Sequence, residues 1–476
     1  MKVFMFNPPT GLYIRGEDRC QVPVKGLTAT APRPPIDFAQ IAGILKEWYG
    51  VRDIYIKDYP VEGGTFKDLY ADFNRIQPDY VIISTTTPTI LKDAQLVKQL
   101  KEDFPETIFV LKGAHFYTTG EDIISRYQVD FAVYGETDIV ASELIGKLEN
   151  GVSPYNIRGI IFYDHNAQRA VRTPPREFFE PLDDLPFPDR SLLRNELYIR
   201  PDTGEPQTTI QSHRGCPFKC TYCLSRVVYG NKVRFRSPQN VVDEIEHVYE
   251  KFGIRNFFFR ADTFTINKKW VIELSKEIIE RGLHEKIQWV TNSRVDTIDE
   301  ERVKWMKKAG CWLVSLGIES GNQEILNRIK KGITLDQARN AVKILKEHGI
   351  KTYLFFMLGF PWESRKEVEE TIQFAKELDG DFYEFHVLVP FPGTEIYDEI
   401  VKLGLLVVDD LTGYDHSKPA IRTLHLTPEE IEELRERAIR ETYLSTRYLK
   451  KKAIEMLKQP RLILPYAKYG LRLLKL

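Results

Sequence analysis

Between residues 207 and 391, short apolar runs and amphipathic helical segments alternate along the chain six times. Each unit spans roughly thirty residues, enough for a strand, a crossover helix and their loops in a parallel sheet. Six such units predict a partial (β/α)6 barrel of the TIM type, whose functional face lies at the carboxyl ends of its strands. The predicted strands are 208–214, 256–262, 287–294, 311–320, 352–360 and 382–391.

Residues 1–150 show a second alternation of the same kind. This pattern predicts a Rossmann-like, doubly wound parallel sheet, which binds ligands at the carboxyl ends of its strands. Small and hydroxyl residues follow the strands, so a large planar ligand could approach the backbone there; ordinary turns in a sheet without a ligand are the alternative. The predicted strands are 2–9, 53–59, 79–87, 107–115 and 131–137, with helices 37–50 and 93–104 between them.

The segments outside these two regions are less regular. Residues 151–200 predict a hairpin and a proline-rich linker, and we assign residues 201–400 to the barrel. Residues 401–476 predict a helical extension, with a capping box at 427–430 and a basic amphipathic tail. We expect the tail to dock on the barrel as a helix; contact with a membrane surface is the alternative. The predicted fold class is therefore α/β with a helical C-terminal extension.

Charge and cysteine content narrow the class of protein. The chain has 67 basic and 68 acidic residues, so it lacks the basic excess of a protein that neutralises many phosphates, and we expect no nucleic-acid partner. Only five of its 476 residues are cysteines, which does not resemble a secreted disulfide framework. No apolar run is long enough to cross a membrane. The expected location is the cytoplasm, with membrane contact at its inner face limited to the tail.

Three of the cysteines, Cys216, Cys220 and Cys223, lie in the stretch RGCPFKCTYC directly after the first barrel strand. A closed zinc site needs four ligands, and only His213 or Cys311 could complete this one. Cys311 opens a predicted strand, so it should lie at the opposite end of the barrel. Three thiolates on a cubane iron–sulfur cluster instead leave one iron without a protein ligand. A non-enzymatic metal-binding module remains the alternative.

The spacing Cys-x3-Cys-x2-Cys, with Tyr222 before the last cysteine, resembles the signature of the radical S-adenosylmethionine superfamily. Segments 317–321, 359–364 and 390–397 resemble further motifs of that barrel, although Trp362 replaces a glycine. The segment 259–264 resembles a Phe-x-Asp-Asp-x-Phe motif whose first aspartate has become alanine. The resemblance implies that the three cysteines hold a [4Fe–4S] cluster whose open iron binds S-adenosylmethionine. The residues it suggests for the cofactor site are Gly317, Glu319 and Ser320, with Tyr222, Asn292 and Arg294 as further candidates.

The N-terminal region resembles the cobalamin-binding domain that many members of this superfamily carry. The matching segments are 7–9, 84–89, 112–120 and 133–137. The Asp-x-His-x-x-Gly motif, which supplies a lower axial histidine in other cobalamin proteins, does not occur, so the resemblance implies cobalamin without a motif histidine ligand. The candidate cobalamin residues are Thr85, Thr86, Thr87, Gly113, His115, Gly135 and Glu136.

Together these resemblances imply a cobalamin-dependent radical S-adenosylmethionine methyltransferase. Such an enzyme methylates an unactivated carbon of a small-molecule or lipid-like substrate, using a 5′-deoxyadenosyl radical, methylcobalamin and an external flavodoxin- or ferredoxin-type electron donor. Cyclisation, rearrangement or oxidation with the same cofactors is the first alternative. A transfer RNA methylthiotransferase ranks lower, because that family has three further cysteines in its N-terminal domain and this chain has only Cys20 there.

Overall fold

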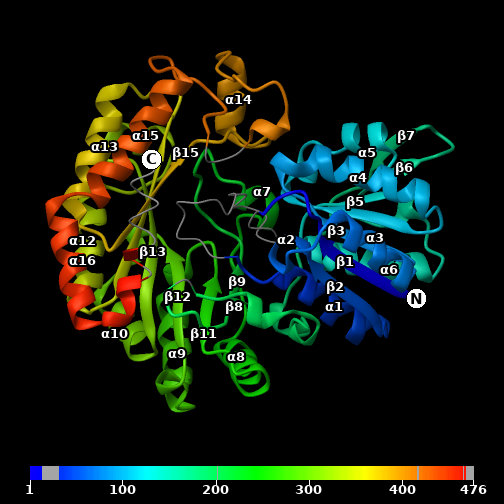
Figure 1. Cartoon of the computed structure of the whole chain (residues 1–476), viewed down its shortest axis with the longest axis horizontal. Coiled ribbons are helices and arrows are strands. Elements are labelled where there is room, and N and C mark those ends of the chain that lie inside the picture. The colour runs from blue at the N-terminus through cyan, green and yellow to red at the C-terminus, as the bar shows by residue number, and fades with distance from the viewer. Residues whose placement is uncertain (13–31, 201, 415–417, 465, 468–476) are drawn as a thin grey trace.

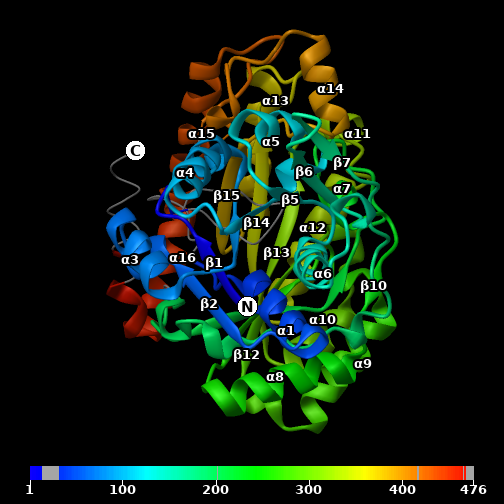
Figure 2. The same cartoon turned by 90° about the vertical axis from the view of Figure 1, so that its right-hand side faces the viewer.

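The computed structural model describes residues 1–12, 32–200, 202–414, 418–464 and 466–467, and Cys20 and residues 468–476 of the predicted tail lie outside this part. The N-terminal sheet and the barrel form two lobes side by side, and the C-terminal helices cover the outer side of the barrel (Figure 1). The view turned by a right angle sets the N-terminal sheet in front of the barrel strands (Figure 2).

The N-terminal lobe is built on a seven-stranded sheet in the order β2-β1-β3-β4-β5-β6-β7. The first five strands are parallel, which confirms the predicted doubly wound sheet. Their order places a topological switch point between β1 and β3, where sheets of this type bind ligands. The parallel strands are β1 (Lys2–Asn7), β2 (Asp53–Asp58), β3 (Tyr80–Ser84), β4 (Ile108–Lys112) and β5 (Phe131–Val133).

Two further strands, β6 (Ile160–Asp164) and β7 (Arg169–Arg172), form the predicted hairpin. The hairpin pairs antiparallel with β5, so it extends the N-terminal sheet. Both faces of the sheet are buried against helices, as the continuous apolar sequence of its strands requires. These helices are α1 (Ile36–Tyr49), α2 (Tyr59–Glu62), α3 (Phe66–Ile76), α4 (Ile90–Asp103), α5 (Glu121–Tyr127) and α6 (Thr137–Glu149).

The second lobe contains six parallel strands in the order β15-β14-β13-β12-β11-β8, which confirms the predicted partial barrel. The strands are β8 (Gln207–Gln211), β11 (Asn256–Arg260), β12 (Gln288–Ser293), β13 (Cys311–Glu319), β14 (Lys351–Leu358) and β15 (Phe382–Val387). The helices that accompany them are α8 (Pro238–Phe252), α9 (Lys268–Glu280), α10 (Glu300–Lys308), α11 (Gln323–Arg328), α12 (Leu335–Glu347) and α13 (Arg365–Leu378).

Side-chain alternation separates the inside of the barrel from its outside. On β14, Leu354 and Phe356 are fully buried in the core shared with the helices, whereas Tyr353 and Phe355 are only partly buried. Because successive strand residues point to opposite faces, Tyr353 and Phe355 face the barrel interior. The same parity on β15 directs Glu384 and His386 inward.

The C-terminal extension packs on the barrel. It comprises α14 (Glu395–Lys402), α15 (Pro428–Tyr443) and α16 (Thr446–Lys458), and α15 begins with the predicted capping box of Thr427 and Glu430. The Tyr448 hydroxyl on α16 donates to the carbonyl of Asp381 at 3.0 Å, and the Lys452 ammonium lies 4.4 Å from the centre of the Phe382 ring. The described part of the tail therefore docks on the barrel as a helix. None of the described helices is both long and apolar enough to cross a membrane.

Candidate functional site

The three clustered cysteines lie on a loop between two short paired strands, β9 (His213–Arg214) and β10 (Arg234–Phe235). The loop begins at Gly215, whose φ is 95° and whose missing Cβ would stand 2.1 Å from the carbonyl oxygen of Lys232. Only glycine fits a backbone that is both left-handed and this close to its neighbour. The tight start turns the chain into the cysteine loop, which also contains helix α7 (Ser225–Tyr229).

The three cysteine side chains are partly exposed and form no disulfide, and Cys220 lies next to a positive charge. Arg294 donates to the Cys220 sulfur at 3.7 Å, and its guanidinium stacks 3.6 Å from the centre of the Phe218 ring on the same loop. A nearby guanidinium favours the thiolate form that binds metals. Three thiols in this environment fit a cluster that takes three protein ligands.

The residues considered for closing a zinc site are engaged elsewhere. Cys311 is the first residue of β13, at the amino end of the barrel strands, and burial raises the pKa of its thiol. The His213 ring packs against Phe235 and Trp270, with ring centres 4.8 and 6.0 Å apart. In the described part of the chain, no three His, Cys, Asp or Glu side chains are grouped to hold a single metal ion.

Across from the cysteine loop, Glu319 ends β13 in a strained conformation. Its φ is 69°, and the pairing of β13 with β14 shifts between Gly317 and Glu319. A Cβ at Gly317 would lie 2.6 Å from the Glu319 carboxylate and 2.9 Å from the Lys331 ammonium. The glycine thus leaves room for a charged pair to fold back over the strand. Strain of this kind persists where the surroundings over-determine it, often at functional sites.

Lys331 is the partner of Glu319, and the sequence analysis did not identify it. Its ammonium donates to Glu319 at 2.7 Å and to the Tyr222 hydroxyl at 3.3 Å. Burial opposes the charge on Lys331, but Glu319 and Cys220 together outweigh it and raise the pKa of the ammonium. Burial, together with Glu319 and the cysteines, raises the pKa of Tyr222 well above its ordinary value. Lys331 does not follow a strand and is not part of a recognised motif, so it can be identified as a site residue only from its contacts in the structure.

The remaining barrel candidates, Arg294, Asn292 and Ser320, differ in what they contact. Arg294 donates to the backbone carbonyl of Lys331 at 2.6 Å, so it links the charged pair to Cys220. Asn292 is half-buried on β12, in register with Ser315 of β13. Ser320 instead bonds Thr371 of α13 at 3.1 Å and caps the turn through Asn322 N–H. The structure thus gathers Cys220, Tyr222, Arg294, Glu319 and Lys331, while the Ser320 hydroxyl holds the loop.

The segment 359–364 forms a tight turn after β14. The buried Glu363 carboxylate accepts the backbone N–H groups of Gly359 and Phe360 at 2.7 and 3.0 Å. Burial raises the pKa of Glu363 to about 8, although these two bonds act in the opposite direction. The side chain therefore organises the loop at the active face of the barrel.

The candidate cobalamin residues lie at the carboxyl edge of the N-terminal sheet. Thr85 donates to the Lys112 carbonyl at 3.0 Å, and a Cβ at Gly113 would stand 2.7 Å from the Thr85 hydroxyl. Thr86 shares a hydroxyl bond with Thr89, and Thr87 is buried beside them. The small residues leave a backbone-lined edge next to the switch point, which fits the approach of a large flat ligand.

His115 lies near this edge as a buried, neutral imidazole. Burial lowers its pKa to about 4, and its Nε2 lies 3.2 Å from the Thr119 hydroxyl.

The Gly135–Glu136 turn follows β5, and its two residues differ in their surroundings. A Cβ at Gly135 would meet only the Tyr117 hydroxyl, at 3.9 Å, whereas both carboxylate oxygens of Glu136 are bonded within the protein.

Comparison with known proteins agrees with the two lobes. The radical SAM superfamily model matches residues 210–375, and the B12 binding domain model matches residues 24–145. An uncharacterised methyltransferase of Pyrococcus horikoshii is 34% identical over 458 residues, which cover 96% of this chain and 95% of that protein.

Two further proteins show similarity over most of the chain. The anaerobic magnesium-protoporphyrin IX monomethyl ester cyclase of Cereibacter sphaeroides is 28% identical over 404 residues, covering 84% of this chain and 65% of the cyclase. The structure of the cobalamin-dependent S-adenosylmethionine radical enzyme OxsB superposes with a TM-score of 0.73 at 15% identity, covering 98% of this chain and 72% of that one. At 15% identity, this superposition shows a shared fold and nothing more.

Proposed function

Because the chain belongs to the radical S-adenosylmethionine superfamily and carries a B12-binding domain, we propose that it methylates a carbon atom of a small-molecule substrate. The proposal rests on one observation: the chain contains both a three-cysteine loop and a sheet of the cobalamin-binding type. Its resemblance to the archaeal methyltransferase, over nearly the full length of both, supports methyl transfer as the outcome.

The residues of the two sheet edges fit the three cofactors. We assign Cys216, Cys220 and Cys223 to the cluster, and the polar group around Glu319 and Lys331 to S-adenosylmethionine. Bound at the carboxyl edges of the two sheets, the cluster would supply an electron for S-adenosylmethionine cleavage, and cobalamin would supply the methyl group. Arg294 donates to the Cys220 sulfur and Lys331 donates to the buried Glu319 carboxylate, so both cations lie beside the proposed cofactor ligands.

Polar side chains inside the barrel fit a substrate that has a polar group. Tyr353 donates to Glu384, and the His386 imidazole lies 3.8 Å from the other oxygen of that carboxylate. Burial lowers the pKa of His386 to about 4, so the ring is neutral at physiological pH. The aromatic rings of Tyr353 and Phe355, 4.7 Å apart, add apolar surface beside it. We infer that this inward-facing row contacts the substrate.

Ring closure or oxidation with the same cofactors is the second candidate, favoured by the similarity to the magnesium-protoporphyrin cyclase. The electron donor in either case would be an external flavodoxin- or ferredoxin-type protein. The transfer RNA methylthiotransferase alternative gains no support, because the matched N-terminal domain is the B12-binding type.

The proposed function is tested by the Cys220→Ala variant. Anaerobically reconstituted, cobalamin-loaded enzyme is incubated with S-adenosylmethionine, a reductant and host metabolite extract, and products are identified by mass spectrometry. We expect the wild type to form 5′-deoxyadenosine and a product heavier by one methyl group. The variant should lose both while its visible cobalamin spectrum persists.

Cys311→Ala is the matched control, because this thiol is buried at the other end of the barrel and should leave both products unchanged. 5′-Deoxyadenosine with only a dehydrogenated or cyclised product would favour the second candidate. Stoichiometric zinc without acid-labile sulfide would refute the cluster assignment itself.

A further inference from the structure

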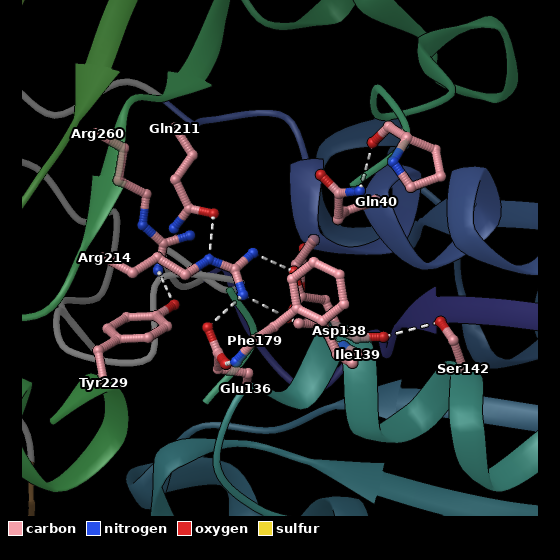
Figure 3. A network of polar contacts seen from close by, with 12 residues as sticks. Gln40, Glu136, Asp138, Ile139, Ser142, Phe179, Gln211, Arg214, Tyr229 and Arg260 are labelled. Carbon is pink, nitrogen blue, oxygen red and sulfur yellow. Dashed lines mark hydrogen bonds and ion pairs between the residues drawn. The ribbon is translucent and has the colours of Figure 1, made fainter. Parts of the chain in front are cut away.

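The two ends of the cysteine loop are bonded to one atom of the other lobe. Arg214 ends β9 just before the loop, and Arg234 opens β10 just after it. Both guanidinium groups donate to the same carboxylate oxygen, Oε1 of Glu136, and both distances are 2.9 Å. Figure 3 shows Arg214 extended between the barrel residue Gln211 and the carboxylates of the N-terminal lobe.

The carboxylates are themselves held firmly in the N-terminal lobe. Glu136 is the N-cap of α6, and Asp138 lies in its first turn, where the helix dipole favours negative charge. The other oxygen of Glu136 accepts the backbone N–H of Phe179 at 2.7 Å. Asp138 accepts Arg214 through both oxygens, at 3.2 and 2.5 Å. The contacts with both arginines are therefore made at the amino end of one helix, α6.

These ion pairs hold Arg214 together with the Tyr229 ring, whose centre lies 5.8 Å from the guanidinium carbon. The guanidinium borders a cavity of about 40 Å³ between the lobes, so part of its surroundings is not filled by side chains. The cavity is lined by polar residues from both lobes, among them Asp37, Gln40, Thr137, Gln211, Arg236 and Glu244.

We propose that Glu136 and Asp138 are positioning residues that clasp the cysteine loop at both ends and set its place relative to the carboxyl edge of the N-terminal sheet. Because the pairs are buried, they contribute more to one defined arrangement than to net stability. One shared oxygen ties the entry and the exit of the loop together, so the cysteines move with the N-terminal lobe. The proposal rests on the assignment of these cysteines as cluster ligands.

Hydrogen exchange of the apo-protein tests the clasp without any cofactor or substrate. In Glu136→Gln, which weakens both ends, we expect backbone amides of residues 215–233 to exchange at least about tenfold faster than in the wild type. Asp138→Asn weakens only the Arg214 end, so its effect should be smaller and concentrated near Gly215. If Glu136→Gln does not fold, Asp138→Asn carries the test.

Glu244→Gln is the matched control. Glu244 is also a buried carboxylate shared by two arginines, Arg190 and Arg236, but neither of these lies on the cysteine loop. Its variant should destabilise the protein while residues 215–233 keep their wild-type exchange. Equal acceleration of the loop in the control and in Glu136→Gln would overturn the proposal, because the effect would then be a general loss of stability.

A spectroscopic measurement on the loaded protein separates positioning from a purely structural role. The reduced cluster accelerates the spin relaxation of cob(II)alamin to a degree set by their separation. In the wild type and in Glu244→Gln, we expect cob(II)alamin to relax at one rate. In Glu136→Gln, we expect this single rate to be lost, because the separation between cluster and cobalamin is no longer fixed. Unchanged relaxation with unchanged loop exchange would overturn the proposal. Loss of cobalamin binding with unchanged loop exchange would also overturn it, because Glu136 would then be a cobalamin contact.

Discussion

At the scale of single residues, the pair of Lys331 and Glu319 places two buried charged side chains near the cysteine loop. Both side chains are at least nine-tenths buried, and their charges lie 2.7 Å apart. Removing one partner of a buried pair leaves the other charge without compensation, whereas removing both costs much less. The pair should therefore behave as a unit in mutagenesis.

We predict that Lys331→Met lowers the free energy of unfolding of the apo-protein by about 3–5 kcal/mol, because Glu319 remains buried without its partner. The double variant Lys331→Met/Glu319→Gln should recover a large part of this loss. Chemical denaturation of the wild type, both single variants and the double variant gives the coupling energy. Additive effects would show that solvent reaches the pair and that it does not stabilise this part of the site.

The sequence analysis identified local signals here and missed those that depend on distant partners. Cys216, Cys220 and Cys223 could be found because their spacing is contained in one loop. Lys331 could not, because its significance arises from Glu319 and Tyr222, and the latter lies 109 positions away. Glu136 was correctly placed at a strand end, but its arginine partners lie 78 and 98 positions away, beyond any local pattern.

At the scale of elements, the turn after β14 is organised by one protonatable group. The Glu363 carboxyl is fully buried and accepts two backbone N–H groups, and it has no nearby cation among its described contacts. With the pKa raised to about 8, the folded protein holds a proton that the unfolded chain releases at much lower pH. Folding stability therefore falls as pH rises from the ordinary glutamate value through about 8.

We predict that Glu363→Gln removes this pH dependence, since glutamine keeps an acceptor oxygen and does not ionise. Urea unfolding of the apo-protein between pH 5 and about 8.5 should show a falling free energy in the wild type and a flatter curve in the variant. Glu367→Gln serves as the control, because this neighbouring carboxylate completes a capping box with Ser364 and its pKa is lowered. A wild-type slope in Glu363→Gln would refute the assignment.

Strands and helices of both lobes were predictable because burial on two faces gives continuous apolar runs, and the intervening helices keep their own periodicity. The hairpin of β6 and β7 was also recognisable from its local pattern. Its pairing with β5 was not, because strand partners are chosen by the exposed sheet edge and not by the turn. The same holds for α16, whose docking depends on Asp381 and Phe382 of the barrel.

At the scale of the whole molecule, the buried charges between the lobes determine how independently each lobe unfolds. Each lobe has its own apolar core, so either could in principle unfold alone. The contacts of Arg214 with Glu136 and Asp138 connect the two lobes through largely buried charges. Separating the lobes would break these pairs, and we therefore expect them to couple the unfolding of one lobe to that of the other.

We predict that the wild-type apo-protein unfolds in one calorimetric transition and that Arg214→Gln unfolds in two. The variant removes the contacts of Arg214 with Glu136 and Asp138 and, of this set, leaves only the bond of Arg234 to Glu136, and each lobe retains its own core. Lys232→Gln is the control, since its pair with Glu180 is exposed and exposed pairs contribute little. Differential scanning calorimetry compares the calorimetric and van't Hoff enthalpies, which agree only for a single cooperative transition. A single, uniformly shifted transition in Arg214→Gln would show that apolar packing between the lobes, rather than the buried charges, couples their unfolding.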